Sequence, residues 1–228
     1  MGCSCANNAI DKYSIENILG DEYEKSNITS KQKLTDYVKK VFFLINKIRT
    51  DPSKFADVVI SYEKFIKEEN EKKIFDHKLK VSLNEGKKMF EDSAEFLRNL
   101  SPMPELLFKD EIVLECPEEP NNIRDINYFK QKVLEKIKQQ KIEAYFKDSI
   151  KEPEISVLLM IVDDARKNAK KKREAVLNPK FKYIGISSTS SETSSNTEGI
   201  NNNENGNKTN NKENGLVKKP FCAYFAFK

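Results

Sequence analysis

The 228-residue sequence contains a single histidine, His77. One imidazole excludes a His-rich metal site, and it excludes a pair of imidazoles acting as acid and base. Apolar runs are short as well, as in 41–45 and 157–162, whereas a membrane-spanning helix needs about 20 apolar residues. The first residues have neither the positive region nor the apolar region of a signal peptide, so we expect the chain to start in the cytosol.

The chain also has few cysteines and a low net charge. The four cysteines are Cys3, Cys5, Cys116 and Cys222, and their spacing matches neither a zinc ribbon nor a small disulfide scaffold. This spacing favours a reducing compartment. Lys and Arg number 40 against 36 Asp and Glu, and a net charge of +4 is too small to indicate nucleic acid as the partner.

The N-terminus offers two kinds of lipid attachment. Gly2 can accept a myristoyl chain, and Cys3 and Cys5 lie within reach of palmitoyl transfer. One myristoyl chain binds a membrane only marginally, at about 0.8 kcal/mol per buried methylene, so stable attachment needs a second chain. Ala6 departs from the myristoylation pattern, which has Ser or Thr there. We expect acylation at Gly2, Cys3 and Cys5, and the alternative is a flexible start with two idle thiols.

The remaining chain divides into a linker and one domain. Residues 1–29 show no sustained periodicity and are predicted to form an acylated tail and linker, and the domain is predicted to cover 30–228. Apolar residues at intervals of three and four predict helices, and the apolar block at 157–162 predicts the central core helix. The predicted helices span 34–49, 51–66, 84–100, 126–146 and 153–168.

The C-terminal part of the chain changes character. Segments 182–187 and 221–227 are rich in aromatic and β-branched residues and are predicted to pair as antiparallel strands. Between them, the Ser- and Asn-rich segment 188–217 has almost no apolar side chains, so we expect a disordered insertion. Segment 106–116 fits a short helix or a strand equally well. Helices followed by strands indicate the α+β class.

Two blocks of sequence carry a family resemblance. The first, 44–55, contains Asn46 and Arg49; the second, 162–186, contains Asp163, Asp164 and Arg173 and ends in Asn-Pro-Lys-Phe-Lys-Tyr-Ile-Gly-Ile. Together they resemble the CAP superfamily, and within it the intracellular SCP-type domains of protists and bacteria. The resemblance covers about 35–228. It implies an α-β-α sandwich with a small antiparallel sheet.

The resemblance also implies a cleft that binds a divalent metal through two histidines and two acidic residues, and here the sequence departs from the family. Lys172 stands where the family has one of these histidines, followed by the retained Arg173. An ammonium group repels a metal cation and has no lone pair to donate. His77 precedes the third predicted helix and does not match the other cleft histidine. Lys172 and Arg173 therefore mark a degenerate cleft, and we assign no metal and no cofactor.

Catalysis is not expected, because the chain has no Cys–His or Ser–His pair at the matching positions. Asp163 and Asp164 occupy consecutive positions, which point about 100° apart on a helix. They predict a capping or packing role, not a carboxylate dyad. Arg173 is expected to pair with one of them and fix the turn.

Basic residues gather next to the degenerate cleft. Near an anionic membrane such a cluster gains about 1 kcal/mol per charge, whereas alone it is a solvated face, and both interpretations remain open. The predicted membrane-surface patch is Arg166, Lys167, Lys170, Lys171, Lys172 and Arg173.

These features favour a non-catalytic CAP-like domain, lipid-anchored on the cytoplasmic face of a membrane, that acts by binding lipids or proteins. The alternative is a structural interaction protein of a larger assembly such as a cilium. A third hypothesis is an enzyme with a rearranged cleft.

Overall fold

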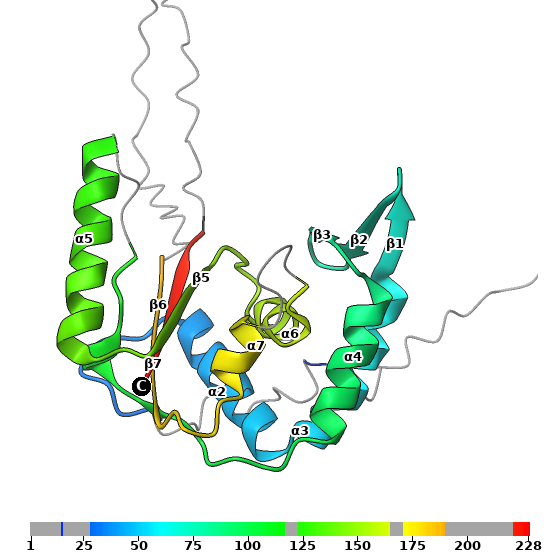
Figure 1. Cartoon of the computed structure of the whole chain (residues 1–228), viewed down its shortest axis with the longest axis horizontal. Helices are drawn as coiled ribbons and strands as arrows, with labels where there is room; N and C mark the ends of the chain where they lie inside the picture. The colour runs from blue at the N-terminus through cyan, green and yellow to red at the C-terminus, as the bar shows by residue number, and fades with distance from the viewer. Residues whose placement is uncertain (1–14, 16–27, 117–122, 165–170, 190–220) are drawn as a thin grey trace, which may run out of the picture.

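The computed structural model describes residues 15, 28–116, 123–164, 171–189 and 221–228. These residues form a mixed α+β fold, which confirms the predicted class (Figure 1). The acylation residues Gly2, Cys3 and Cys5 lie outside the described part of the chain. Within the described part, no helix combines the length and the apolar character needed to cross a membrane.

The first two predicted helices are present. α2 spans Asp36–Thr50 and begins after Thr35, whose side chain accepts a hydrogen bond from the backbone N–H of Val38. α3 spans Pro52–Ser61 and begins at Asp51-Pro52 as expected, because the Asp51 carboxylate caps the helix and proline suits its first turn. α3 ends earlier than predicted. A 3-10 turn, Tyr62–Phe65, leads the chain into a strand.

That strand opens a three-stranded antiparallel sheet that the sequence analysis does not predict. Its strands are β1 (Ile66–Glu69), β2 (Lys72–Asp76) and β3 (Lys80–Leu83), in the order β1-β2-β3. Asn70 and Glu71 both have positive φ in the β1–β2 turn. In Figure 1 the sheet stands at the edge of the molecule, next to α4.

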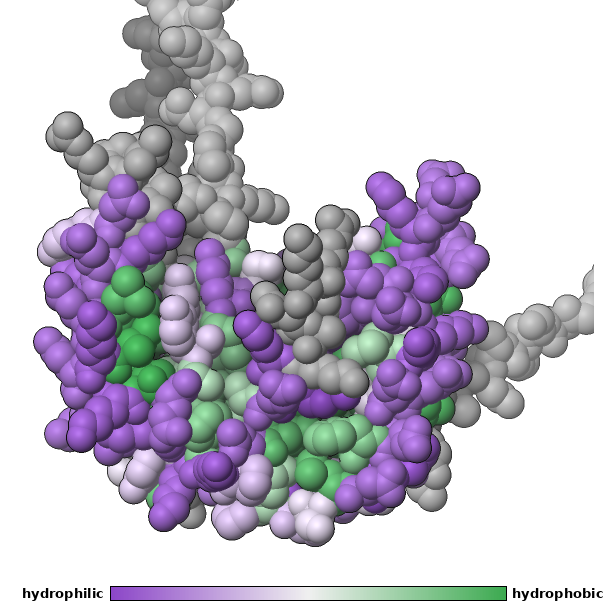
Figure 2. All heavy atoms as spheres, in the orientation of Figure 1, coloured by the Kyte–Doolittle hydropathy of each residue, from purple (hydrophilic) through white to green (hydrophobic). Residues whose placement is uncertain are grey.

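The later helices are shorter than predicted. α4 spans Lys87–Arg98, α5 spans Ile123–Gln140 and α6 spans Pro153–Val162. The predicted end of α5 is wrong, because Ala144–Asp148 forms strand β5. α6 ends at Asp163, which adopts a left-handed conformation, and the short helix α7 (Lys171–Val176) follows. Figure 2 shows hydrophilic residues over α4 and along the outer side of α5, as expected for amphipathic helices.

The main sheet has the strand order β4-β6-β7-β5. β6 (Tyr183–Ser188) and β7 (Ala223–Phe227) pair antiparallel as predicted, and β5 pairs antiparallel with β7. β4 (Leu107–Phe108) pairs parallel with β6, so the sheet is mixed and the expectation of a purely antiparallel sheet is wrong. Thr189 and Cys222 continue the β6–β7 pairing through backbone hydrogen bonds. Residues 190–217 of the predicted insertion lie outside the described residues.

Helices cover both faces of this sheet. Ile184, Ile186 and Phe225 face the main core with α2 and α6. Tyr183 and Tyr224 face the opposite side and pack with Ile137 and Val133 of α5, near the 3-10 turn Asp110–Ile112. Alternation along the strands thus separates two apolar layers, which gives an α-β-α arrangement.

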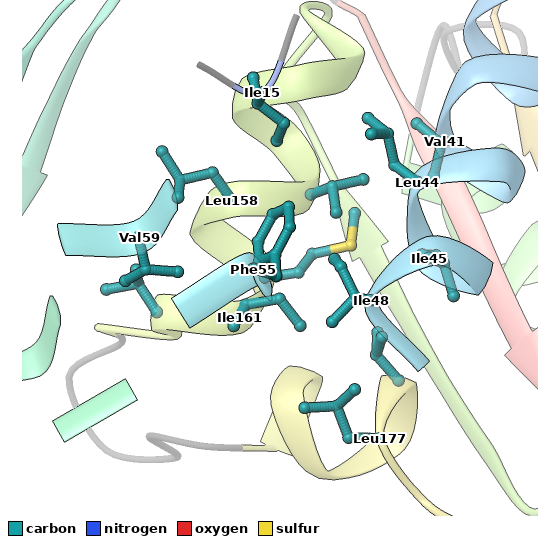
Figure 3. Packing of buried hydrophobic residues seen from close by; sticks show 14 of the residues in the cluster. Ile15, Val41, Leu44, Ile45, Ile48, Phe55, Val59, Leu158, Ile161 and Leu177 are labelled. Atoms are coloured by element: carbon teal, nitrogen blue, oxygen red, sulfur yellow. The ribbon is translucent and has the colours of Figure 1, made fainter. Parts of the chain in front are cut away.

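The main core is built around α6, which is apolar on almost every side, as predicted for the central helix. Figure 3 shows Leu158 and Ile161 of α6 in the same cluster as Phe55 of α3 and Ile48 of α2. Ile15 belongs to this cluster and is fully buried. Ile15, which lies within the predicted tail and linker 1–29, therefore packs against the domain.

Candidate functional site

The two sequence blocks that carry the family resemblance meet in the fold. Arg49 is fully buried, and its guanidinium donates hydrogen bonds to the carbonyl oxygens of Val176, Asn178 and Phe181 at 2.8, 3.0 and 3.3 Å. Its Nε donates to the carbonyl of Pro104 at 3.0 Å. Burial lowers the pKa of Arg49. The first block therefore holds the second in place, which is a structural role.

Asp163 and Asp164 bind backbone amides, which fits the predicted capping role. The Asp163 carboxylate accepts hydrogen bonds from the backbone N–H groups of Lys172 and Arg173 at 2.6 and 3.3 Å. Asp164 accepts from the backbone N–H of Asn84 and from Gly86 just before α4, at 3.0 and 2.9 Å. Burial raises the pKa of Asp163, an effect that the two amides oppose.

Two predictions about Arg173, its place in a surface patch and its ion pair with an aspartate, are wrong. It is buried, with 3% of its surface exposed, so it does not belong to a membrane-surface patch. Its guanidinium donates to the carbonyl oxygens of Ile161 and Val162 at 2.6 and 2.8 Å and to Ser93 Oγ. Only its backbone N–H contacts Asp163, so the expected side-chain ion pair with an aspartate is wrong.

The predicted basic patch is only partly within the described residues. Arg166, Lys167 and Lys170 lie outside them. Lys171 is exposed and Lys172 is partly exposed, so these two remain compatible with a surface role.

Lys172 lies in a cleft of about 740 Å³, whereas Arg173 borders a separate hollow between α4 and α7. Consecutive helical positions point in different directions, so the expectation that both residues line one degenerate cleft is wrong for Arg173. The cleft lies between β3 and the β5–α6 connection, with Leu159 of α6 also lining it. Its lining residues are Leu79, Lys80, Val81, Ser82, Leu83, Asp148, Ser149, Ile150, Lys151, Glu152, Leu159, Asp163, Asp164, Lys172 and Phe221.

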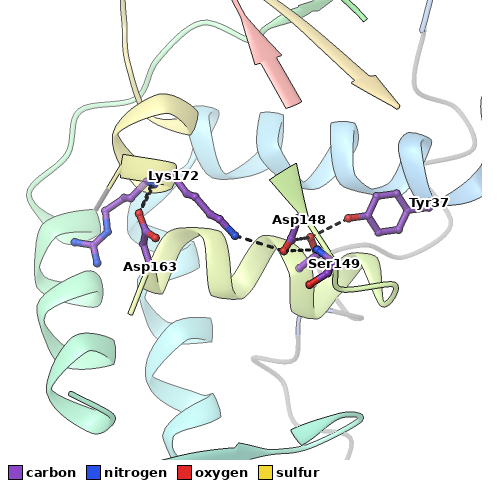
Figure 4. Close-up of polar contacts among 7 residues, drawn as sticks. Tyr37, Asp148, Ser149, Asp163 and Lys172 are labelled. Carbon is purple, nitrogen blue, oxygen red and sulfur yellow. Dashed lines mark hydrogen bonds and ion pairs between the residues drawn. The ribbon is translucent and has the colours of Figure 1, made fainter. Parts of the chain in front are cut away.

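A buried polar chain leads from this cleft into the core (Figure 4). Lys172 Nζ lies 3.4 Å from Asp148 Oδ1, and Ser156 Oγ donates to Asp148 Oδ2 at 2.6 Å. The hydroxyl groups of Tyr37 and Ser156 are hydrogen-bonded at 2.9 Å. Because Ser156 donates its proton to Asp148, Tyr37 is the donor in this second bond. Burial raises the pKa of Tyr37 far above its usual range. The chain fixes Asp148 as the counterion of Lys172.

No sequence motif singles out Asp148, Ser156 or Tyr37 as site residues. The available signal for Ser156 is a hydroxyl within the otherwise apolar stretch 155–162, and for Tyr37 it is a hydroxyl on the helix face that also carries Val41 and Leu44. A buried hydroxyl requires a hydrogen-bond partner. The sequence does not identify that partner, because β5 lies on a different segment.

Within the described part of the chain, His77, Cys116 and Cys222 do not line the cleft. The His77 ring is half-buried, with its centroid 4.1 Å from that of Phe65. Burial raises the pKa of Cys116 to about 12, and its thiol donates to the carbonyl of Cys222 at 3.2 Å. Among the described residues, no group of three His, Cys, Asp or Glu is placed to hold a metal ion.

The chain matches no protein-family model, no curated protein and no solved structure. Any inference about function therefore rests on the sequence and on the geometry of the site.

Proposed function

We propose that the chain is a non-catalytic, CAP-like binding domain held on the cytoplasmic face of a membrane by acyl chains on Gly2, Cys3 and Cys5. Its partners are membrane lipids or other proteins. The two acylation signals support stable attachment, because a single myristoyl chain binds only marginally. The cleft that contains Lys172 supports the binding role.

One observation carries the binding interpretation: the aspartates of the cleft are engaged in holding the fold. Asp163 and Asp164 bind backbone amides, and Asp148 is satisfied by Ser156, by the backbone N–H of Ser149 at 2.9 Å and by Lys172. These bonds give the three aspartates a structural role, in which their carboxylates hold the walls of the cavity in place.

The position of Ile15 supports a short tether. Ile15 is packed in the core, and a fully extended chain from Gly2 to Ile15 spans at most about 45 Å. Acyl chains on the N-terminal residues would therefore hold the domain close to the membrane surface. The cleft would then face partners that are concentrated at the same membrane.

Membrane flotation of the full chain, expressed in eukaryotic cells, tests this proposal. We expect wild type to float with membranes, Gly2→Ala to remain soluble, and the Cys3→Ser/Cys5→Ser double variant to float weakly. Ser4→Ala is the matched control, since it keeps all three acylation residues. The mass of the N-terminal peptide should report the acyl chains directly. If wild type and Gly2→Ala are equally soluble, the tether is wrong and the assembly alternative gains support.

A further inference from the structure

Among the strands that the structure describes, β3 has one edge without a partner strand. In the order β1-β2-β3, β2 is the one described strand that pairs with β3, with Phe75 opposite Val81 and Asp76 opposite Lys80. A strand at the edge of a sheet presents backbone N–H and C=O groups without ladder partners. The free edge therefore presents polar groups to whatever lies beside it.

The hydrogen-bond pattern identifies which residues present these groups. The backbone N–H of His77 donates to the carbonyl of Leu79 at the start of the β2–β3 ladder. Because bonded positions alternate along an antiparallel pair, Val81 and Leu83 direct their backbone groups to β2. Lys80 and Ser82 direct theirs away from it. Lys80 and Ser82 are two residues apart, so their backbone groups lie about 7 Å apart along the strand. This is the spacing at which a neighbouring strand forms its hydrogen bonds.

The cleft lies along this free edge. Five consecutive residues, 79–83, line it. A cavity above one face of a sheet would contact only alternate residues, because side chains point to opposite faces in turn. Contact with every residue in succession therefore places the cleft beside the backbone. The opposite wall is also a continuous stretch, 148–152, so the cleft is a slot between two lengths of backbone.

Apolar side chains and the Lys172 ammonium complete the slot, whose two backbone walls also carry Lys80, paired with Glu69 at 3.3 Å, and Lys151, paired with Glu152 at 3.6 Å. Leu159 of α6 and Phe221 line it together with Lys172. The Lys172 ammonium has three N–H donors, and its one hydrogen bond among the described residues is the 3.4 Å contact with Asp148. Its side chain is 29% exposed. An acceptor group that enters the slot can therefore reach a donor that the fold does not saturate.

We propose that the slot binds a short extended peptide of a partner protein, added as a fourth strand along the edge of β3. Main-chain bonds to Lys80 and Ser82 supply affinity, an apolar side chain covers Leu159 and Phe221, and a carboxylate or carbonyl of the peptide accepts from Lys172. A lipid chain cannot satisfy a row of alternating backbone donors and acceptors. The four-residue edge and the small volume suit a single strand better than a folded domain. This inference rests on the binding part of the proposed function.

Selection from a phage-displayed library of random short peptides, using the Gly2→Ala full chain, tests the proposal. The Gly2→Ala substitution prevents myristoylation, so the outcome of the peptide selection does not depend on whether the wild type floats with membranes. Ser82→Pro removes the outward N–H without breaking a bond to β2, since proline is tolerated on edge strands and the residue before it is already extended. Ser82→Ala keeps that N–H and is the matched control.

We expect the recovered peptides to bind the Gly2→Ala chain and its Ser82→Ala derivative equally, and the Ser82→Pro derivative at least about tenfold more weakly. Lys172→Gln should weaken peptides that carry a carboxylate more than neutral ones. Unfolding midpoints establish that each variant is folded. Equal binding to Ser82→Pro, or no enriched peptide, overturns the proposal. So does a dimer of the chain that Ser82→Pro dissociates, because a second copy would then occupy the slot.

Amide hydrogen exchange keeps the test decisive if Ser82→Pro does not fold. On adding the best recovered peptide to the Gly2→Ala chain, the amides of Lys80 and Ser82 should become protected. The amides of Val81 and Leu83, already bonded to β2, should change little. Protection confined to other elements would overturn the proposal. Flotation of wild type together with failed peptide binding would leave the tether intact and reject only the peptide site.

Discussion

At the scale of single residues, two buried arginines hold the C-terminal ends of α6 and α7. Arg173 donates to the carbonyls of Ile161 and Val162 at the end of α6, and Arg49 donates to the carbonyl of Val176 at the end of α7. The C-terminus of a helix carries partial negative charge and unpaired carbonyls, so a cation there is favourable. Arginine suits both places because its planar fork reaches several carbonyls at once.

Asp163 gives a pH prediction at the same scale. Its pKa is raised in the fold, mainly by burial, so folding favours its protonated form. The stability that this group contributes is fully present below its unfolded pKa of about 3.9 and is lost as the pH rises through the folded pKa. Asn cannot ionise and also tolerates the left-handed backbone at this position. Urea unfolding should show Asp163→Asn gaining stability relative to wild type as the pH rises.

The control for this prediction is Asp57→Asn, which removes the same charge at an exposed position. Its difference from wild type should change little over the same pH range. A difference for Asp163→Asn that stays constant, or that shifts toward wild type with rising pH, would contradict the role of burial at Asp163.

The candidate site was only partly predictable from the residues. The motif predicts Lys172 in the cleft, and the structure places it there. The motif also predicts Arg173 in the same cleft, but the turn of α7 directs it to the other side, and this difference depends on helical phase. Asp148 and Tyr37 could not be predicted, because their meeting depends on how β5 and α2 pack against α6.

At the scale of elements, β6 contacts the backbone that follows β4. A Cβ atom on Gly185 would lie 2.7 Å from the backbone N of Val113 and 2.8 Å from the carbonyl carbon of Ile112. Backbone at that distance cannot rotate away as a flexible side chain can. Gly185→Ala should therefore cost about 3 kcal/mol of unfolding free energy, measured by urea denaturation.

Ile186→Val, at the adjacent position, controls for a general sensitivity of β6. It removes one buried methyl group and should cost about 1 kcal/mol. If Gly185→Ala costs no more than Ile186→Val, the close approach of the two backbones does not limit the fold.

The longer helices were predictable because α2 and α4 have an apolar period and α6 is a continuous apolar block, whereas the short helix α7 was not predicted. The β1–β3 sheet was not, because its strands are short and highly charged, and only Phe75 and Leu83 are buried in them. The boundary between α5 and β5 was missed for a related reason. Phe146 belongs to a strand that is fixed by pairing with β7, a contact between distant segments that the local sequence pattern does not show.

At the scale of the whole molecule, Ile15 links the N-terminal tail to the domain. Its side chain is fully buried in the main core, and its backbone N–H lies 3.4 Å from the hydroxyl of Tyr62. If this docking contributes to the fold, Ile15→Ala leaves a cavity and should cost about 3 kcal/mol in urea unfolding. Leu107→Ala, which removes a side chain that is 60% exposed, should change stability by no more than about 0.5 kcal/mol.

The Ile15→Ala variant also distinguishes between a short and a long tether. With Ile15 docked, acyl chains at the N-terminus hold the domain within about 45 Å of their attachment point, whereas a linker that runs to residue 29 would allow about twice that reach. Ile15→Ala should therefore increase the distance between membrane and domain, measured by energy transfer from a label on the domain to labelled lipid. An unchanged unfolding midpoint together with an unchanged distance would show that the tail does not dock.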